Sequence, residues 1–509
     1  MKRVLTERNR YFDSVFLMRI GTELERLKGI SHATVAMGTP ANLANLQAVG
    51  FAFDDCGRVT PQDLLIALDV RAEADIEAAQ ARLEELLAGA GSEGDAADVR
   101  PGSLIEAIEF GSGANLALIS VPGLYAAREA RTALRAGLHV MLFSDNVSIE
   151  DEVMLKEEAI ERGLLMMGPD CGTAILNGAP LGFANVCRRG GIGIVGASGT
   201  GVQEVSTLVH QFGGGISQAI GTGGRDLSAD VEGRMTRFGI EALGADPQTR
   251  AVVVVSKTPA PGVGERVVET LAETGKPAVV NFVGGEPRDP IGDIAFAETL
   301  AEAALLACQA IDVRLPERST IGVSALAATP TDRSDGRLVG LFCGGTLCQE
   351  AWSLMDRADF DVRSNVASDA PKRVRPGERV EGHVLWDLGD DAFTVGKPHP
   401  MIAPSLRDDE VLSYGADRSV GIVLVDCVLG YGAHPDPAGS LARAAEHAMA
   451  TAVADGRELR VLASVTGTEL DPQDATTQCA VLEAAGILVA ESNAAAVQQA
   501  MAALGGGTA

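Results

Sequence analysis

The sequence predicts an α/β protein made of several Rossmann-like and flavodoxin-like parallel-sheet domains, preceded by a small N-terminal α/β unit. Short apolar strands alternate with amphipathic helices along most of the 509 residues. The 59 glycines cluster after apolar runs, as expected where strands turn tightly into helices. An apolar share of 46% is enough for several cores, so we expect about three or four domains.

The first half of the chain predicts two units. Residues 1–92 alternate strand-like and helix-like stretches and end in an acidic amphipathic helix over residues 73–88, a pattern that favours a ferredoxin-like unit. A turn-rich segment at residues 89–103 predicts a linker. Residues 98–188 contain the strands NLALISVPG and HVMLFSDN, each followed by a helical stretch. Such strands pair in parallel through right-handed crossovers, which predicts a Rossmann-like half domain.

The second half predicts two larger units that share a plan. Residues 190–313 open on GIGIVGASGTG and later carry the strands AVVVVSKTP and KPAVVNFVGG. Residues 314–337 have the Pro, Ser, Thr and Asp content of an exposed connector. Residues 338–505 open on LVGLFCGGT and include SVGIVLVDCVLGYGAHPD. Because each unit runs from an apolar strand through a glycine turn into a helix, we interpret the pair as an internal repeat.

Charge and cysteine usage limit the classes of partner. Lys and Arg total 42 against 69 acids, a formal net charge of -27, so the overall field disfavours nucleic acid and anionic membranes as partners. An anionic substrate must then be gathered by local dipoles. The eight cysteines show no CxxC pair, and there is no signal-peptide core or apolar run of membrane-spanning length. These features predict a cytoplasmic protein with no metal site.

The most informative turn is GIGIVGASGTGVQE, residues 191–204. A buried strand delivers Ser198, Gly199 and Thr200 to a helix start, where free N–H groups and the helix dipole favour a phosphate or carboxylate. The alternative is that Ser198 or Thr200 only caps the helix and that the glycines serve packing. No GK[ST] follows and no acidic residue stands at the dinucleotide-binding distance, so neither a Walker motif nor an NAD site is predicted.

A second glycine turn adds to this hypothesis. Gly430 and Gly432 follow a strand and lie beside His434. Two helix starts that face each other would hold phosphate despite the negative chain. His434 could bind phosphate when protonated, or simply cap the helix.

Other side chains are candidates for the same site. Lys257 and Arg225 end an apolar strand and a glycine turn, where we expect cations near an anionic substrate. His399 sits between prolines in KPHPM, a rigid presentation that suits substrate binding or general acid catalysis, while a surface turn histidine is the alternative.

Acidic and thiol groups are weaker candidates. Three aspartates could orient a substrate amide or hold Mg²⁺, although a solvated acidic turn is the commoner outcome; they are Asp387, Asp390 and Asp391. Cys343 and Cys348 lack further metal ligands nearby in sequence, so buried thiols are expected.

These residues carry a resemblance to a known family. GASGTGVQE resembles the phosphate turn of the succinyl-CoA synthetase alpha subunit, including a glutamate at the place of Glu204, and GPDCG and GTGGRD are similar to two further turns of that subunit. Residues 338–505 resemble the carboxy-terminal ligase domain of the beta subunit, with WDLGDDA in place of one glycine turn and LGYGAHPD at the second phosphate-facing turn. Alpha-like and beta-like parts in one chain, with GLFCGGTLCQEA and DAFTVGKPHPMI, are similar to the FdrA family.

The resemblance implies that residues 98–188 are a domain of the CoA-binding type. The sequence patterns and the resemblance together give a set of expected site residues. Catalytic roles are expected for His399, Glu204 and Lys257. Phosphate or substrate binding is expected for residues in four turns, namely Ser198, Gly199, Thr200, Gly223, Gly224, Arg225, Gly344, Gly345, Thr346, Gly430, Gly432 and His434.

One departure from the succinyl-CoA synthetases decides the expected activity. Those enzymes shuttle phosphate on a histidine that follows the strand corresponding to KPAVVNFVGG. This chain has histidines only at positions 32, 139, 210, 383, 399, 434 and 447, so the shuttle is missing there. The nucleotide-binding domain that precedes the beta ligase domain is missing too, so direct use of ATP is not expected.

The expected function is therefore a phosphate-dependent carbamoyl or acyl transfer. The FdrA resemblance implies a subunit of an oxamate carbamoyltransferase, which converts oxalurate and phosphate into oxamate and carbamoyl phosphate in purine and allantoin catabolism. Inorganic phosphate is the expected co-substrate, CoA and Mg²⁺ stay open, and separate partner subunits and a homo-oligomer are expected. The alternatives are an acyl-CoA synthetase that borrows its phosphohistidine and nucleotide domain from a partner, and a non-catalytic scaffold.

Overall fold

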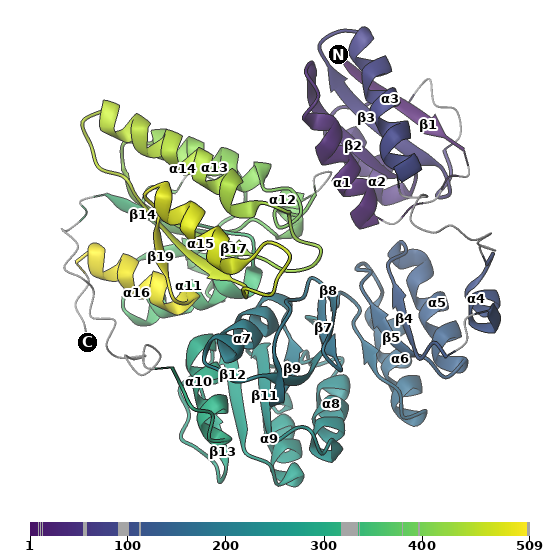
Figure 1. Ribbon diagram of the computed structural model, residues 1–509, viewed down its shortest axis with the longest axis vertical. Coiled ribbons are helices and arrows are strands. Elements are labelled where there is room, and N and C mark those ends of the chain that lie inside the picture. Colours follow the sequence, from purple (N-terminus) through teal and green to yellow (C-terminus); the bar gives the residue numbers. More distant parts are fainter. Residues whose placement is uncertain are drawn as a thin grey trace.

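The computed structural model describes most of the chain and contains four β-sheets in the described part (Figure 1). The described residues are 1–8, 10, 12, 14–53, 59–89, 101–110, 113–316, 334, 336–378, 380–394 and 398–505. Within these ranges no helix is both long and apolar enough to cross a bilayer. The predicted linkers at residues 89–103 and 314–337 fall largely outside the described residues.

The first sheet belongs to the N-terminal domain. Its elements are β1 (Lys2–Glu7), α1 (Ser14–Glu25), β2 (Ile30–Met37), α2 (Pro40–Ala48), β3 (Leu64–Val70) and α3 (Ala74–Gly89). The strands are antiparallel in the order β1-β3-β2, in agreement with the predicted small α/β unit. Its hydrophobic clusters contain only residues of this domain, so it has a core of its own. Arg26 approaches His434 of the C-terminal domain, with 3.3 Å between Nη2 and Nε2.

The second sheet is short and parallel. Its domain, called here the β4–β6 domain, consists of α4 (Leu104–Phe110), β4 (Leu116–Ile119), α5 (Gly123–Arg135), β5 (His139–Leu142), α6 (Ile149–Glu161) and β6 (Met166–Met167). A buried lysine links the β4–β6 domain to the domain that follows it in the chain. Lys156 Nζ donates to Glu152 at 2.7 Å, to the Thr222 carbonyl at 2.9 Å and to Asp226 at 2.7 Å.

The third sheet has seven strands in the order β13-β12-β11-β9-β10-β7-β8. The elements of this seven-stranded domain are β7 (Thr173–Leu176), β8 (Ala179–Gly182), β9 (Arg189–Ala197), α7 (Gly199–Gln211), β10 (Ile216–Gly221), α8 (Arg234–Ala245), β11 (Ala251–Lys257), α9 (Val263–Thr274), β12 (Ala278–Val283), β13 (Ile294–Phe296) and α10 (Leu300–Ala310). The hairpin of β7 and β8 was expected in the preceding unit, residues 98–188. It joins this sheet because β7 pairs with β10, Ile175 opposite Ala219.

The fourth sheet has six parallel strands in the order β15-β16-β14-β17-β18-β19. The elements of this six-stranded domain are β14 (Arg337–Phe342), α11 (Gly345–Arg357), β15 (Val362–Ser364), the 3₁₀ helix η2 (Ala370–Lys372), β16 (His383–Asp387), α12 (Asp391–Thr394), α13 (Ser405–Ala416), β17 (Val420–Val428), α14 (Pro437–Ala454), β18 (Arg460–Thr466), α15 (Ala475–Ala484), β19 (Leu488–Ala490) and α16 (Asn493–Ala503). Parallel sheets with helices on their faces agree with the predicted fold class.

The internal repeat is visible in two matching helices. The segment GTGVQE begins α7 and GTLCQE begins α11. Glu204 accepts the N–H of Asn493 at the start of α16 at 3.0 Å, and Glu350 accepts the N–H of Leu300 at the start of α10 at 2.7 Å. Each helix therefore carries a glutamate that caps the last helix of the other domain.

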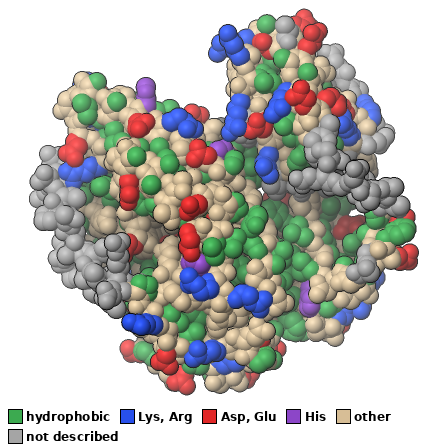
Figure 2. All heavy atoms as spheres, in the orientation of Figure 1, with side chains coloured by type: hydrophobic (Ala, Val, Ile, Leu, Met, Phe, Trp, Pro, Cys, Tyr) green, Lys and Arg blue, Asp and Glu red, His purple; other side chains and the backbone are tan. Residues whose placement is uncertain are grey.

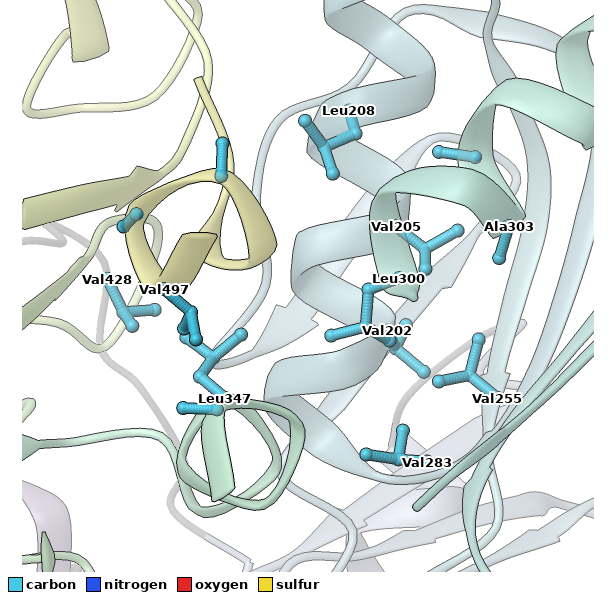
Figure 3. Packing of buried hydrophobic residues seen from close by; sticks show 14 of the residues in the cluster. Val202, Val205, Leu208, Val255, Val283, Leu300, Ala303, Leu347, Val428 and Val497 are labelled. Carbon is cyan, nitrogen blue, oxygen red and sulfur yellow. The ribbon is translucent and has the colours of Figure 1, made fainter. Parts of the chain in front are cut away.

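The two large domains share one apolar core at this interface. Val202 on α7, Leu300 on α10, Leu347 on α11 and Val497 on α16 belong to a single cluster and are fully buried (Figure 3). Burial of apolar surface away from water stabilises this packing by about 25 cal/mol per Å². The starts of α7 and α11 are consequently held by a rigid support.

The buried glutamate Glu350 is expected to make stability fall with rising pH. Burial raises its pKa to about 7, against the opposing effect of hydrogen bonds from Leu300 and Asn493. The folded chain therefore binds more protons than the unfolded chain between the ordinary glutamate pKa and about pH 7, and the free energy of unfolding drops across that window. Urea unfolding at pH 5 and pH 8 measures this drop.

Two variants test the same group. Glu350→Gln cannot ionise, so its unfolding free energy is expected to fall less than that of the wild type between the two pH values. Glu350→Ala leaves buried donors unpaired and is expected to cost about 2–4 kcal/mol. An identical pH dependence in Glu350→Gln and wild type would contradict this assignment.

Candidate functional site

Two helix N-termini meet where the seven-stranded and six-stranded domains join. Ser198 Oγ lies 2.6 Å from Thr346 Oγ1 and also accepts the N–H of Gly201 at 3.1 Å. A Cβ atom added to Gly344 would lie 3.0 Å from the Thr200 methyl group, so the helix starts are in direct contact. First-turn N–H groups have no acceptor within their own helix and carry the positive end of the dipole. The residues predicted at the two turns, 198–200 and 344–346, are thus brought together.

The turn at Gly430 and Gly432 does not form the second helix start, and the expectation that it does is wrong. Helix α14 begins at Pro437, and the carboxylate of Asp436 caps it by accepting the N–H of Gly439 at 3.0 Å. The N–H of Gly430 donates to Gln473 at 3.1 Å and is not available to a ligand. Both glycines adopt positive φ, 109° and 79°, which explains their presence by backbone geometry.

The two helix ends differ in how well they could accept an anion. At α11 the N–H groups of Cys343 and Gly344 each donate to Asp426 at 2.7 Å. A Cβ atom on Gly345 would lie 2.5 Å from Asp387 Oδ2, so a second carboxylate faces the same end. At α7 a Cβ atom on the exposed Gly199 would meet only Thr173 Oγ1 within 4 Å, at 3.4 Å. The carboxylates therefore lie closer to the start of α11 than to Gly199.

Lys257 lies within electrostatic reach of two carboxyl groups near these helix ends. It is exposed at the end of β11. Burial raises the pKa of Asp387 to about 7, and the charge of Lys257 opposes this shift. Burial and the charges of Asp145 and Asp391 raise the pKa of Asp170 to about 6, again opposed by Lys257. These side chains and the two helix starts are called here the candidate site.

His399 is a neutral donor beside Asp387. Its Nδ1 accepts the N–H of Met401 at 3.2 Å, which places the proton of the neutral ring on Nε2. A Cβ atom on Gly389 would lie 2.5 Å from Nε2 and 3.2 Å from Asp387 Oδ1, so the ring and the carboxyl share one corner. Burial lowers the pKa of His399 to about 4, so it is uncharged near neutral pH.

Four other predicted residues lie at the edge of the candidate site or away from it. His434 Nδ1 accepts the N–H of Asp436 at 3.1 Å, and its other nitrogen faces Arg26 of the N-terminal domain. Arg225 donates to the Val147 carbonyl at 2.9 Å and pairs with Glu152 at 2.8 Å, which ties the Gly223–Gly224 turn to the β4–β6 domain. That turn lies beside Asp170 of the candidate site, since a Cβ atom on Gly224 would lie 3.8 Å from Asp170 Oδ2.

Glu204 lies in the domain interface and not in the candidate site, which corrects its expected catalytic role. It is 2% exposed, and both carboxylate oxygens are engaged, one with Thr466 Oγ1 at 2.5 Å and one with the N–H of Asn493 at 3.0 Å. Burial raises its pKa. No oxygen of this side chain is left for a bound phosphate.

Sequence reasoning missed Asp426. This fully buried carboxylate ends the apolar run SVGIVLVD in β17. A carboxylate in an otherwise apolar strand is itself a signal, because burying it requires donors such as the two N–H groups that it accepts.

Thiols and acids do not form a metal site in the described part of the chain. Cys343 and Cys348 are buried, as expected, and burial raises the pKa of both thiols well above the ordinary value. Within the described ranges there is no group of three or more His, Cys, Asp or Glu side chains arranged to hold a metal ion. Asp387, Asp390 and Asp391 thus remain candidates for contacts to substrate.

The glycines at the two helix starts are expected to tolerate alanine differently. Gly199→Ala meets only Thr173 Oγ1 at 3.4 Å and should unfold within about 1 kcal/mol of wild type. Gly345→Ala drives its methyl group into Asp387 Oδ2 and should cost about 1–3 kcal/mol and displace that carboxyl group. Urea unfolding of both variants measures the difference, and equal stabilities would contradict the placement of Asp387.

Three family models match parts of the chain. A CoA-ligase model matches residues 341–503, a CoA binding domain model matches residues 188–285, and a model described as AllF, heavy metal-associated domain matches residues 1–101. The CoA binding match covers β9 to β12 of the seven-stranded domain, whereas the CoA-binding type was expected for residues 98–188.

The heavy-metal description does not fit the donors in the N-terminal domain. Residues 1–101 contain a single cysteine, Cys56, which lies outside the described residues. Soft metal ions are held by sets of soft ligands such as thiolates, which a single cysteine cannot supply. In the described part of this domain no group of three or more His, Cys, Asp or Glu side chains could hold a metal ion.

Relatives cover either the whole chain or part of it. The chain is 43% identical to the uncharacterized protein YahF of Escherichia coli K12 over 500 residues, 96% of each chain. It is 33% identical over 152 residues to the alpha subunit of the ADP-forming succinate–CoA ligase of Aquifex aeolicus, 29% of this chain and 48% of that subunit. Among solved structures, a dinucleotide-forming acetyl-coenzyme A synthetase 1 of Ca. Korarchaeum cryptofilum has 15% identity and a TM-score of 0.31, over 77% of this chain and 82% of that chain.

Proposed function

The chain belongs to the family of YahF, and we propose that it is an enzyme subunit in which inorganic phosphate, bound at the start of α7, attacks an acyl carbon. One observation carries the proposal. Hydroxyl groups of Ser198 and Thr173 lie at the start of α7, whereas the carboxylates of Asp426 and Asp387 lie at the start of α11. The chain has no histidine between Gln211 and Gly382, where the resemblance places the phosphate carrier, which supports phosphate itself as the reactant.

The groups of the candidate site supply what such a reaction needs. N–H groups of Gly199 and Thr200 orient the phosphate, and Lys257 balances the charge that develops on the phosphate and the acyl oxygen. His399 donates through Nε2 to a group on the substrate. The support behind these groups is rigid because α7 and α11 are embedded in the shared core.

The acidic side chains near the helix starts favour an acyl group that bears N–H donors. Asp170, Asp387 and Asp391 accept hydrogen bonds when ionised, so they suit an amide or carbamoyl group and repel a bare carboxylate at the same point. The finer form of the proposal is a carbamoyl transfer, in which oxalurate and phosphate give oxamate and carbamoyl phosphate, with separate partner subunits.

The family matches favour a second candidate, an acid–CoA ligase. The chain carries CoA-ligase and CoA binding domain matches, and its partial relatives are subunits of ADP-forming CoA ligases. In that case CoA is the acyl acceptor, and a partner supplies the phosphohistidine and the nucleotide domain.

Product analysis separates the candidates. The purified chain, together with the proteins encoded beside it, is incubated with oxalurate and phosphate, and carbamoyl phosphate is measured. The transferase proposal predicts carbamoyl phosphate without CoA or nucleotide. Formation of ADP that depends on CoA would establish the ligase instead, and partner activity that is unchanged without this chain would indicate a scaffold.

A further inference from the structure

We propose that Asp387 is the residue that transfers the proton during the exchange, carrying it from the attacking phosphate to the leaving group. This inference rests on the proposed phosphate chemistry and gives a catalytic role to Asp387, which the sequence analysis considered only for orienting a substrate amide or holding Mg²⁺.

The backbone and one oxygen of Asp387 are fixed at the carboxyl end of β16. Asn365 accepts its N–H at 2.9 Å and donates to its carbonyl at 3.0 Å. Oδ1 accepts the N–H of Gly389 at 3.0 Å. The residue is 8% exposed, so its side chain has little freedom to leave this position.

The second oxygen is directed at the helix ends. A Cβ atom on Gly345 would lie 2.5 Å from Oδ2, which places this oxygen at the first residue of α11. No donor is paired with Oδ2 among the described residues, although the side chain is more than nine-tenths buried. Because Ser198 and Thr346 join the two helix starts, Oδ2 lies beside the place proposed for phosphate.

The surrounding charges keep this carboxyl group near its titration point. Burial raises the pKa to about 7, the carboxylates of Asp390 and Asp426 push in the same direction, and Lys257 and the Gly389 N–H oppose them. His399 at the same corner is neutral, and the N-terminal dipole of α11 favours the ionised form. A group with a pKa near the working pH can both give and take a proton.

Its neighbours are less suited to the role. Both oxygens of Asp426 are used by the N–H groups of Cys343 and Gly344. Asp390 accepts the N–H of Ala392 and caps α12. His399, with a pKa lowered to about 4, holds no extra proton to give near neutral pH.

The step balances without another reactant. An oxygen of HPO₄²⁻ forms a bond to the acyl carbon, and the bond from that carbon to the leaving nitrogen breaks with its electron pair going to nitrogen. The protonated carboxyl of Asp387 gives its proton to that nitrogen and then takes the proton of the phosphate, so the residue returns to its starting state.

The binding test uses sulfate, whose charge does not change between pH 6 and pH 8, and calorimetry on the full chain. Ionisation of Asp387 beside the anion is expected to weaken sulfate binding across this range by about tenfold. Asp387→Asn should remove most of the pH dependence and leave the smaller part that comes from Asp170, whose pKa is about 6. Asp390→Asn, which removes a charge from the same loop, should keep the full pH dependence. An unchanged pH dependence in Asp387→Asn would overturn the placement.

The turnover test uses the assembled enzyme. Asp387→Asn should reduce phosphate-dependent turnover by about 100-fold or more, and Asp387→Glu should restore part of it. If the wild-type enzyme is active with phosphate and Asp387→Asn is equally active, this inference fails while the proposed function stands. If the wild type makes no acyl phosphate, the proposed function fails, whatever the sulfate titration shows.

Discussion

Replacing Gly199 with aspartate is expected to reduce phosphate-dependent turnover by at least about 100-fold and to leave the fold intact. Gly199 is the exposed first residue of α7, and a Cβ atom there meets only Thr173 Oγ1 at 3.4 Å. The new carboxylate would occupy the anion position and repel phosphate, a loss comparable to removing an oxyanion-hole donor. Steady-state turnover at saturating acyl substrate, with phosphate varied, measures the effect.

The control for this variant is Gly199→Asn, which has the same shape without the charge. It should keep most of its phosphate affinity. An acidic side chain in the first turn stabilises a helix by about 0.3–1 kcal/mol through its interaction with the helix dipole. Gly199→Asp should therefore unfold no more easily than Gly199→Asn. Equal turnover of the two variants would show that no anion binds at this helix end.

Replacing Lys257 with glutamine is expected to have an effect of similar size, about 100-fold on turnover. Its charge lowers the pKa of both Asp387 and Asp170, so its removal should raise both above about 7 and about 6, respectively. The base limb of the pH–rate profile should therefore move to higher pH. Lys257→Arg keeps the charge and should keep the wild-type profile.

A pH–rate profile of Lys257→Gln that coincides with that of the wild type would contradict the placement of Lys257 near Asp387 and Asp170. Lys257 is exposed and lies at a strand end, so the substitution should not alter the core. Thermal unfolding of both variants checks this directly.

Local patterns were sufficient to predict the fold and one helix start. The run GIGIVGASGT predicts a buried strand, a glycine turn and a helix, and β9 and α7 realise that order. The surface seen in Figure 2 carries acidic and basic side chains interspersed, in keeping with the scattered charges of the sequence. The fold class and the start of α7 could be predicted because both depend on residues that are close together along the chain.

Partners across the domain interface could not be predicted in the same way. The helix that faces α7 is α11, and the matching segments GTGVQE and GTLCQE were the signal that could have identified it. The choice of the Gly430 turn was wrong although Asp436 and Pro437, a typical N-cap and first helical residue, could have indicated that the helix starts later. Glu204 was misplaced because its partners, Thr466 and Asn493, come from the far end of the chain.

The most direct test of the central claim is a crystal structure of the chain grown with inorganic phosphate. The account predicts a phosphate ion that accepts hydrogen bonds from the N–H groups of Gly199 and Thr200, and its loss in crystals of Gly199→Asp. Phosphate bound at Gly430 and Gly432 with the start of α7 empty, or phosphate attached covalently to a histidine of this chain, would contradict it.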